Sequence, residues 1–281
     1  MVVMRHEVID KELFKIMQDY WEDFQYQRAK EMRLPKAERC IVESSIPVIW
    51  FGDMEKYRRS PLKIVTVALN PSKNEFSEDK RFGEFEKISK KTVLDREELF
   101  VFYEALSSYF KREPYWRWFR SFEDPLNALG ASYKTKNRDG VSMHNIALHI
   151  DVCTAIATNS PWGKLGKLKE NIRERLVKGR NGAFSLFKNL VEYLEPDVVL
   201  YAANKKEIFY EAFSLTDSNR VKSYSPGKNG FKIDTNIYTY HKDCLVVKGP
   251  NVGKPFAGLK GDFVKDTMLK IKKSYKEIFD K

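Results

Sequence analysis

Two hydrophobic patterns alternate along the chain. Between residues 10 and 32, apolar side chains recur every three or four positions with Glu and Lys between them, which predicts an amphipathic helix. Asp10 is placed to cap its start, and Leu34-Pro35 is placed to end it. Residues 63–69, in contrast, form a β-branched run without polar alternation, which predicts a strand covered on both faces of a sheet.

The rest of the chain repeats these patterns. Helical spacing is found over 96–112, after Pro114, and over 164–178, 183–194, 204–213 and 260–279. Strand-like runs are found over 145–150 and 197–202, and twice within 231–247. Residues 46–52 form a short apolar run closed by Gly, and 131–142 form a polar loop. This alternation predicts a three-layer α/β/α fold with a central, mostly parallel sheet.

The domain organisation is inferred from the features that usually separate domains. The sequence has no internal repeat, low-complexity segment or clear linker, so we expect one domain over 1–281. Within it, residues 1–60 read as a helical N-terminal extension and residues 62–275 as the core.

The charge balance adds the first indication of a partner. The chain of 281 residues carries a formal net charge of +11, and its pI is about 9.3. Fixed positive charge displaces condensed counterions from nucleic acid, so DNA is the favoured partner. The alternative is a Lys-rich surface that is simply solvated.

The cysteines and the start of the chain indicate which compartment and which cofactors to expect. Three distant cysteines and no Cys-x-x-Cys pair argue against a zinc site, an iron–sulfur cluster or a disulfide framework. Charged residues at positions 5–7 interrupt any signal peptide, and no apolar run reaches the roughly 20 residues of a membrane span. We therefore expect a soluble, cytoplasmic protein that uses no metal or other cofactor.

Three polar segments follow predicted strands. They are residues 68–72, 150–154 and 248–254. Ligands of open α/β sheets bind beyond the carboxyl ends of the strands, so this shared position favours a binding site. Taken singly, each segment is also an ordinary turn, helix cap or flexible loop.

The first segment carries a family resemblance. Ala68-Leu69-Asn70-Pro71-Ser72 resembles the Gly-x-Asn-Pro-Gly motif of the mismatch-specific and single-strand-selective branches of the uracil-DNA glycosylase superfamily. In that family the motif follows the first sheet strand and activates a water molecule. An aromatic residue soon after it stacks on the flipped base, and Phe76-Ser77 resembles that pair.

The other two segments match the family in order, over roughly residues 62–275. Asp151 falls where the family has a polar residue, often Asn, that reads the base edge. Gly249-Pro250-Asn251 aligns with a loop, often His-Pro-Ser, that enters the minor groove and stabilises the departing base. The chain departs from the pattern by having Asp for Asn and no loop His. His241, eight residues before Gly249, reads as structural.

The resemblance implies a monomeric, monofunctional DNA glycosylase acting on duplex or single-stranded DNA. It assigns catalysis to Asn70, through a water held by its amide, and to Asp151. The base-binding residues it suggests are Leu69, Phe76, Asp151 and His149. The DNA-binding residues it suggests are Ser72, Lys248, Gly249, Pro250, Asn251, Gly253 and Lys254.

The carboxylate of Asp151 changes the expected substrate. An ionised carboxylate only accepts hydrogen bonds, so it matches the exocyclic amine of cytosine better than the carbonyl of uracil. Since plain cytosine is ubiquitous, a modified cytosine such as glucosylated hydroxymethylcytosine of phage DNA is favoured, in a defence role. Uracil or mismatch repair stays open if Asp151 is protonated or activates water, or if Asn145 or His149 reads the base.

Other readings of the same residues stay open. The fold could serve a nucleic-acid-binding module without catalysis, or an unrelated enzyme acting on a nucleotide or phosphate ester. The basic stretch over 164–180 is either a phosphate contact or a solvated helix face, and Lys248, Lys254 and Lys260 are favoured over it. The aromatic residues over 115–119 are expected to pack in the core rather than stack on bases.

Overall fold

The computed structural model describes most of the chain. The described residues are 9–76, 82, 86–112, 114–168, 172–202, 208, 211–213, 220–225, 232–250, 256 and 261–280. Internal contacts divide the chain into two compact units, each assembled from three segments. Unit 1 comprises residues 1–51, 69–114 and 151–193, and unit 2 comprises residues 52–68, 115–150 and 194–281. The expectation of one domain with an N-terminal extension stays a prediction.

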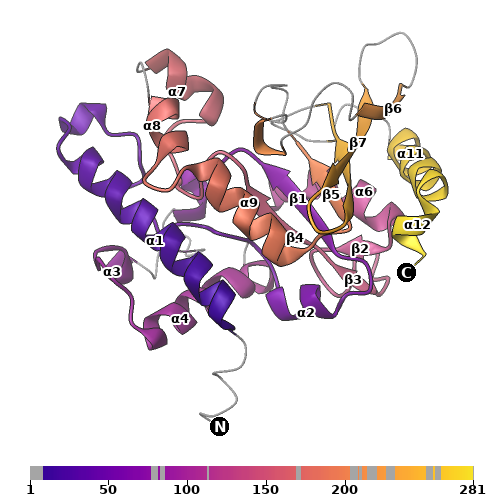
Figure 1. Cartoon of the computed structure of the whole chain (residues 1–281), viewed down its shortest axis with the longest axis horizontal. Helices are drawn as coiled ribbons and strands as arrows, with labels where there is room; N and C mark the ends of the chain where they lie inside the picture. Colours follow the sequence, from indigo (N-terminus) through magenta and orange to yellow (C-terminus); the bar gives the residue numbers. More distant parts are fainter. Residues whose placement is uncertain are drawn as a thin grey trace. The chain divides into compact units, whose positions relative to one another are not determined.

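A six-stranded sheet runs through the region of unit 2, in the order β4-β1-β5-β8-β7-β6 (Figure 1). The strands are β1 (Ile64–Ala68), β4 (Leu148–Asp151), β5 (Val198–Tyr201), β6 (Arg220–Tyr224), β7 (Ile233–Thr239) and β8 (Asp243–Lys248). β5 pairs in parallel with both β1 and β8, whereas β7 is antiparallel to its neighbours β8 and β6. The predicted α/β fold with a mostly parallel central sheet is confirmed.

The central strands β1 and β5 form where the sequence is mostly apolar, with Thr66 as a polar residue buried inside β1. All residues of β1 and β5 are buried, as expected for strands covered on both faces. At their amino ends the buried carboxylate of Asp197 accepts hydrogen bonds from Lys63 N at 2.9 Å and Lys242 Nζ at 2.8 Å. Asp197 therefore anchors the starts of three parallel strands.

The segment around residue 147 differs from the prediction of one strand over 145–150. β3 (Asn145–Ile146) pairs in parallel with β2 (Ala131–Ser132) in a separate two-stranded sheet. The chain then passes through Ala147 into β4, which lies beside β1. β2, inside a predicted loop, was missed because two residues carry no periodicity, and β6 was missed because it lacks an apolar run.

Unit 1 is built around helices (Figure 1). They are α1 (Lys11–Met32), α3 (Glu86–Ser89), α4 (Arg96–Ser107), α7 (Trp162–Leu168), α8 (Ile172–Lys178) and α9 (Ala183–Leu194), with short 3₁₀ turns η2 (Lys36–Glu38), η3 (Lys73–Phe76) and η5 (Tyr109–Lys111). Asp10 caps α1 as predicted, accepting from Leu13 N at 2.8 Å. The helix predicted over 96–112 is divided into α4 and η5, whereas α7 and α8 cover the described part of the helix predicted over 164–178, and residues 169–171 lie outside the described residues.

Unit 2 also contains helices. They are α2 (Met54–Arg59), α5 (Trp116–Phe119), α6 (Glu123–Ala128), α11 (Gly261–Ser274) and α12 (Lys276–Phe279), with the 3₁₀ turn η6 (Arg120–Phe122). α11 packs on α6 and on α12 (Figure 1). The helix predicted over 204–213 lies largely outside the described residues. In the described part of the chain, no helix is long and apolar enough to span a membrane.

Candidate functional site

Asn70 stands two residues beyond β1, and its amide is held by two acceptors. Nδ2 donates to Thr158 Oγ1 at 2.9 Å and to the backbone oxygen of Pro71 at 3.0 Å. Both amide hydrogens are thereby used. Oδ1 receives no hydrogen bond from any described residue, and it can therefore accept one from a water molecule.

The segments that carry Asn70 and Asp151 lie side by side in unit 1. Cys153 N donates to the backbone oxygen of Leu69 at 2.9 Å, just beyond the ends of β4 and β1. Farther along, Ser72 forms a bridge with Thr158, so the two segments stay paired. The first two strand-end segments singled out in the sequence are thus brought together.

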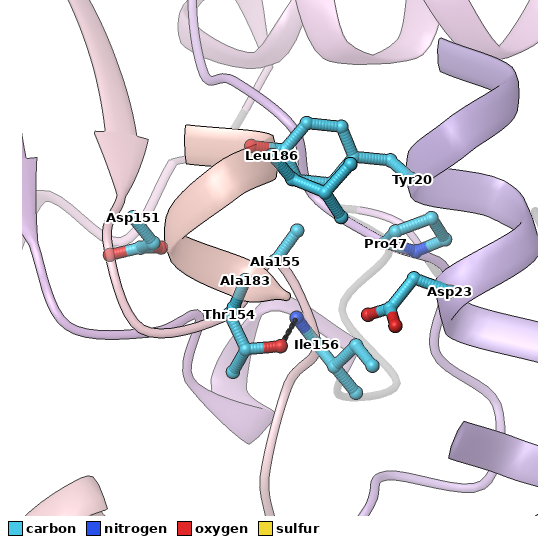
Figure 2. Close-up of a pocket in the computed structure, with 9 residues that line it drawn as sticks. All are labelled: Tyr20, Asp23, Pro47, Asp151, Thr154, Ala155, Ile156, Ala183 and Leu186. Carbon is cyan, nitrogen blue, oxygen red and sulfur yellow. Dashed lines mark hydrogen bonds between the residues drawn. The ribbon is translucent and has the colours of Figure 1, made fainter. Parts of the chain in front are cut away.

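Asp151 faces a narrow pocket inside unit 1 (Figure 2). The lining residues are Tyr20, Asp23, Pro47, Asp151, Thr154, Ala155, Ile156, Ala183 and Leu186. Tyr20 and Asp23 come from α1, and Asp23 lies across the pocket from Asp151 in the view of Figure 2. No water molecule fits between the side chains, so a base can enter only if they move apart.

Burial raises the pKa values of two polar side chains in this pocket. Burial raises the pKa of the Asp23 carboxyl, and the hydrogen bond from Arg180 N, at 2.6 Å, partly offsets it. Burial, followed by the nearby carboxyls of Asp23 and Asp151, raises the pKa of the Tyr20 hydroxyl far above its usual value. The phenol therefore stays protonated at neutral pH.

Gly179 makes the approach of Asp23 possible. Its backbone φ is +42°, a value that residues with a side chain rarely adopt, and a Cβ there would lie 2.3 Å from Asp23 Oδ1. Glycine at this position therefore lets the turn after α8 pass directly over the carboxylate.

Phe76 packs within an aromatic group of unit 1. The residue is 8% exposed, and its ring centroid lies 5.7 Å from that of Phe82, which stacks on Tyr109. Beside it, the buried carboxylate of Glu75 accepts a hydrogen bond from the Tyr109 hydroxyl. Stacking of Phe76 on a flipped base stays a prediction, and it requires that the ring become accessible.

His149 belongs to unit 2 and is enclosed by aromatic rings. The residue is 2% exposed, and its Nδ1 lies 2.8 Å from Thr66 Oγ1. Trp118 and Phe119 meet its ring edge-on at 5.0 and 5.2 Å. These contacts give His149 a packing role. Of the aromatic residues expected to pack in the core over 115–119, Phe119 is buried, whereas Tyr115, Trp116 and Trp118 are half-buried.

The segment after β8 is only partly described. Lys248 ends the strand and is half-buried, Gly249 N donates to Tyr201 O at 2.8 Å, and Pro250 is half-buried. The predicted DNA contacts Asn251, Gly253 and Lys254 lie outside the described residues, as does Lys260.

Three cations of the basic stretch pair with carboxylates in unit 1. Arg175 forms an ion pair with Glu31, Lys178 with Glu174, and Arg180 with Glu22. Lys164 is exposed, Arg173 donates to Gly163 O at 3.0 Å, and the side chains of Lys167 and Lys169 are not among those described. The pairing reduces the charge that this stretch offers to phosphate.

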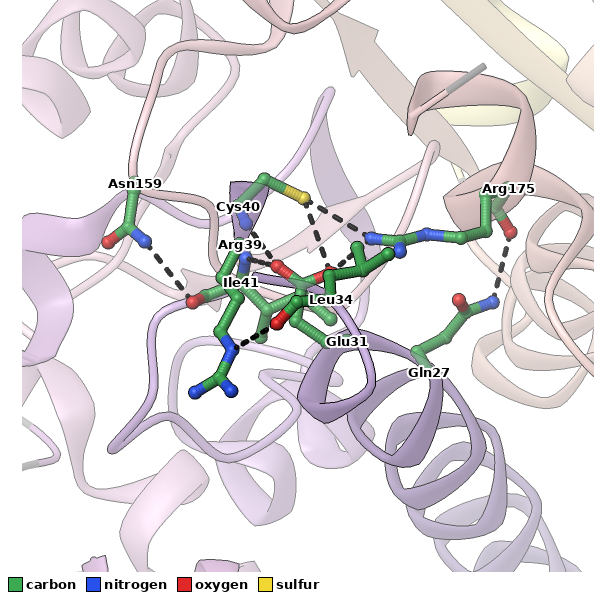
Figure 3. Close-up of polar contacts among 8 residues, drawn as sticks. All are labelled: Gln27, Glu31, Leu34, Arg39, Cys40, Ile41, Asn159 and Arg175. Atoms are coloured by element: carbon green, nitrogen blue, oxygen red, sulfur yellow. Dashed lines mark hydrogen bonds and ion pairs between the residues drawn. The ribbon is translucent and has the colours of Figure 1, made fainter. Parts of the chain in front are cut away.

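The Glu31–Arg175 pair holds three segments together (Figure 3). Glu31, near the end of α1, also accepts hydrogen bonds from the backbone N–H groups of Cys40 and Ile41. Burial raises the pKa of the Cys40 thiol to about 12, with Glu31 adding to the effect, so the thiol stays protonated and unreactive.

The described part of the chain contains no set of side chains suited to bind a metal ion. No group of three or more His, Cys, Asp or Glu side chains there is arranged to hold a metal ion. Cys40, Cys153 and Cys244 are buried, free thiols.

Three residues of the site escaped sequence analysis. Tyr20 and Asp23 read as part of an amphipathic helix, and their contact with the pocket depends on tertiary packing. Thr158 follows the Asp151 segment as one more hydroxyl in a small-residue run, without any signal that it meets Asn70.

Comparisons of the chain's sequence with known proteins found no match. No protein-family model matches the chain, and no curated protein matches it at a significant level.

Proposed function

We propose that the protein is a DNA glycosylase of the uracil-DNA glycosylase kind, which flips a base and hydrolyses its N-glycosidic bond. The observation that carries the proposal is the fixed amide of Asn70, which follows a central parallel strand and keeps Oδ1 available for a water. The hydrogen bond between Cys153 and Leu69, which joins this segment to that of Asp151, supports it. The net charge of +11 suits a polyanionic partner.

The reaction needs little proton chemistry from the protein. The bond between C1′ and the base nitrogen breaks, its electron pair leaves with the base, and the sugar passes through an oxocarbenium-like state. A water oxygen then bonds to C1′, and its proton passes to the departing base or to solvent. Asn70 Oδ1 would accept one water hydrogen and so direct a lone pair at C1′, without acting as a strong base.

Asp151 is proposed to select the base. Its carboxylate suits the exocyclic amine of a cytosine derivative, and a ring substituent would separate that substrate from ordinary cytosine. Of the substrates considered above, a glucosylated hydroxymethylcytosine of phage DNA is therefore preferred to uracil. Since the pocket beside Asp151 is closed, base entry would be accompanied by movement of its side chains.

The substrate assignment predicts a switch in preference. Wild type is expected to release the modified cytosine faster than uracil, and Asp151→Asn is expected to lose that preference because an amide can also donate. The measurement is single-turnover release from matched oligonucleotides carrying each base. Efficient uracil release by wild type, without action on any cytosine derivative, would rule out this role of Asp151.

DNA binding is expected to weaken steeply as salt rises. Each phosphate neutralised contributes a slope of about −0.9 to the log–log plot of affinity against salt for duplex DNA. Fluorescence anisotropy between low and physiological ionic strength measures the slope, and a neutral polymer of similar size serves as the control. An affinity that does not change with salt would argue against DNA as the partner.

A binding module without catalysis is the second candidate, favoured by the closed pocket and by the missing loop His. Alkali treatment separates the two functions, because it breaks the strand only at abasic sites. Strand breakage after incubation supports a glycosylase, whereas bound but unbroken DNA supports the module. Turnover of free nucleotides would instead point to an unrelated α/β enzyme. For the glycosylase we expect a cytoplasmic monomer.

A further inference from the structure

We propose that Thr158 is the positioning residue that fixes the amide orientation of Asn70 and so prepares Oδ1 to hold the attacking water. This inference rests on the proposed glycosylase function and adds a second residue to its site. Thr158 is 3% exposed, and its hydroxyl is the side-chain group that contacts the Asn70 amide.

The hydrogen bonds around the Thr158 hydroxyl allow one arrangement of protons. Oγ1 lies 2.7 Å from the backbone oxygen of Ser160, which can only accept, so the hydroxyl proton points there. Oγ1 therefore has only lone pairs to offer Asn70, at 2.9 Å, and the amide must present its NH₂ group.

The second acceptor of the Asn70 amide favours the same amide orientation. Pro71 O, 3.0 Å from Asn70 Nδ2, is also a carbonyl oxygen that cannot donate. A flipped amide would bring Oδ1 against two acceptor oxygens and would leave the NH₂ group toward the water position. At the position that faces the water, the flip would therefore replace the Oδ1 acceptor with the NH₂ donor.

The backbone around Thr158 keeps the hydroxyl in place. Thr158 forms bridges with Ile41 on one side and Ser72 on the other. The next residue, Asn159, donates from its backbone to Cys40 O at 2.8 Å and from its side chain to Ile41 O at 3.2 Å. The side-chain bond is visible in Figure 3. The hydroxyl is thus held before substrate arrives, as electrostatic preorganisation requires.

The effect is expected in the chemical step. Thr158→Val removes the acceptor while nearly keeping the shape, so the amide loses its preferred orientation. We expect base release under single-turnover conditions to slow by about 10- to 100-fold, as for other losses of positioning. DNA affinity is expected to change less than about 2-fold, because the amide orients a water and does not bind phosphate.

Three further variants separate positioning from folding. Thr158→Ser keeps the hydroxyl and should retain release within about 3-fold of wild type, as an intact acceptor predicts. The double variant Asn70→Ala/Thr158→Val should be no slower than Asn70→Ala, because Thr158 acts only through Asn70. Thr235→Val, which removes another buried threonine hydroxyl, bonded to Tyr275, controls for loss of a buried hydrogen bond.

The readout is release of uracil, hydroxymethylcytosine or its glucosylated form from oligonucleotides, with thermal unfolding recorded for every variant. If Thr158→Val does not fold, Thr158→Ala and the Ser variant carry the same comparison. An active wild type with an equally fast Thr158→Val, or a double variant slower than Asn70→Ala, overturns the positioning role and leaves the glycosylase standing. A wild type that binds DNA but releases no base overturns the glycosylase, and the positioning role falls with it.

Discussion

Asn70→Ala is expected to bind DNA normally and to lose base release by about 100-fold or more, as for other positioned polar groups. The methyl group of Ala cannot accept a hydrogen bond, so the water keeps no fixed orientation toward C1′. Binding should survive because the amide is engaged by Thr158 and Pro71 within the protein. Single-turnover release, followed with enzyme in excess, isolates the chemical step from DNA dissociation.

The matched control for this variant is Asn137→Ala. Asn137 also uses its side chain locally, accepting from the backbone N–H groups of Asp139 and Val141 in a turn of unit 2. It should release the base at the wild-type rate. Near-normal release by Asn70→Ala, with the Asn137 variant behaving alike, would remove Asn70 from the mechanism.

Arg175→Leu is expected to lower the free energy of unfolding by about 3 kcal/mol, because it leaves the Glu31 carboxylate buried without its cation. The Glu31 side chain is 4% exposed, and the hydrogen bonds from Cys40 and Ile41 remain to solvate it in part. The expected value therefore lies at the lower end of the range for a broken buried pair. Urea denaturation followed by circular dichroism measures it.

Lys178→Leu on the same helix is the matched comparison. Its ion pair with Glu174 has side chains that are 72% and 53% exposed, so its loss should change stability by less than about 1 kcal/mol. The double variant Glu31→Leu/Arg175→Leu should recover part of the loss, because no unpaired charge is then buried. Equal destabilisation by Arg175→Leu and Lys178→Leu would contradict the structural role of the buried pair.

The centre of the sheet was predictable because β1 and β5 are β-branched, mostly apolar runs. The runs that form β1 and β5 carry no charged residue and do not alternate apolar with polar residues, and few structures other than a doubly covered strand bury such a run. The break at Ala147 was not predictable, since apolar residues continue across it. The hydrogen bond from Ala147 N to Ser132 O, which ties this segment to β2, is a tertiary contact.

The candidate site was predictable only in part, because its contacts link distant positions. Chain position marked Asn70 and Asp151 as strand-end polar residues. Thr158 was invisible because its bond to Asn70 spans 88 residues. Arg175 resembled a phosphate-binding cation because local charge pattern could not reveal its partner Glu31, which is 144 residues away.

Direct detection of a released base tests the central claim most closely. Wild type is incubated with oligonucleotides containing uracil, hydroxymethylcytosine or glucosylated hydroxymethylcytosine, the free base is quantified by mass spectrometry, and abasic sites are counted by alkaline cleavage. The account predicts one free base for each abasic site, with a cytosine derivative preferred and with release greatly slowed in Asn70→Ala. DNA that is bound with salt-dependent affinity yet yields neither a free base nor an abasic site would contradict it.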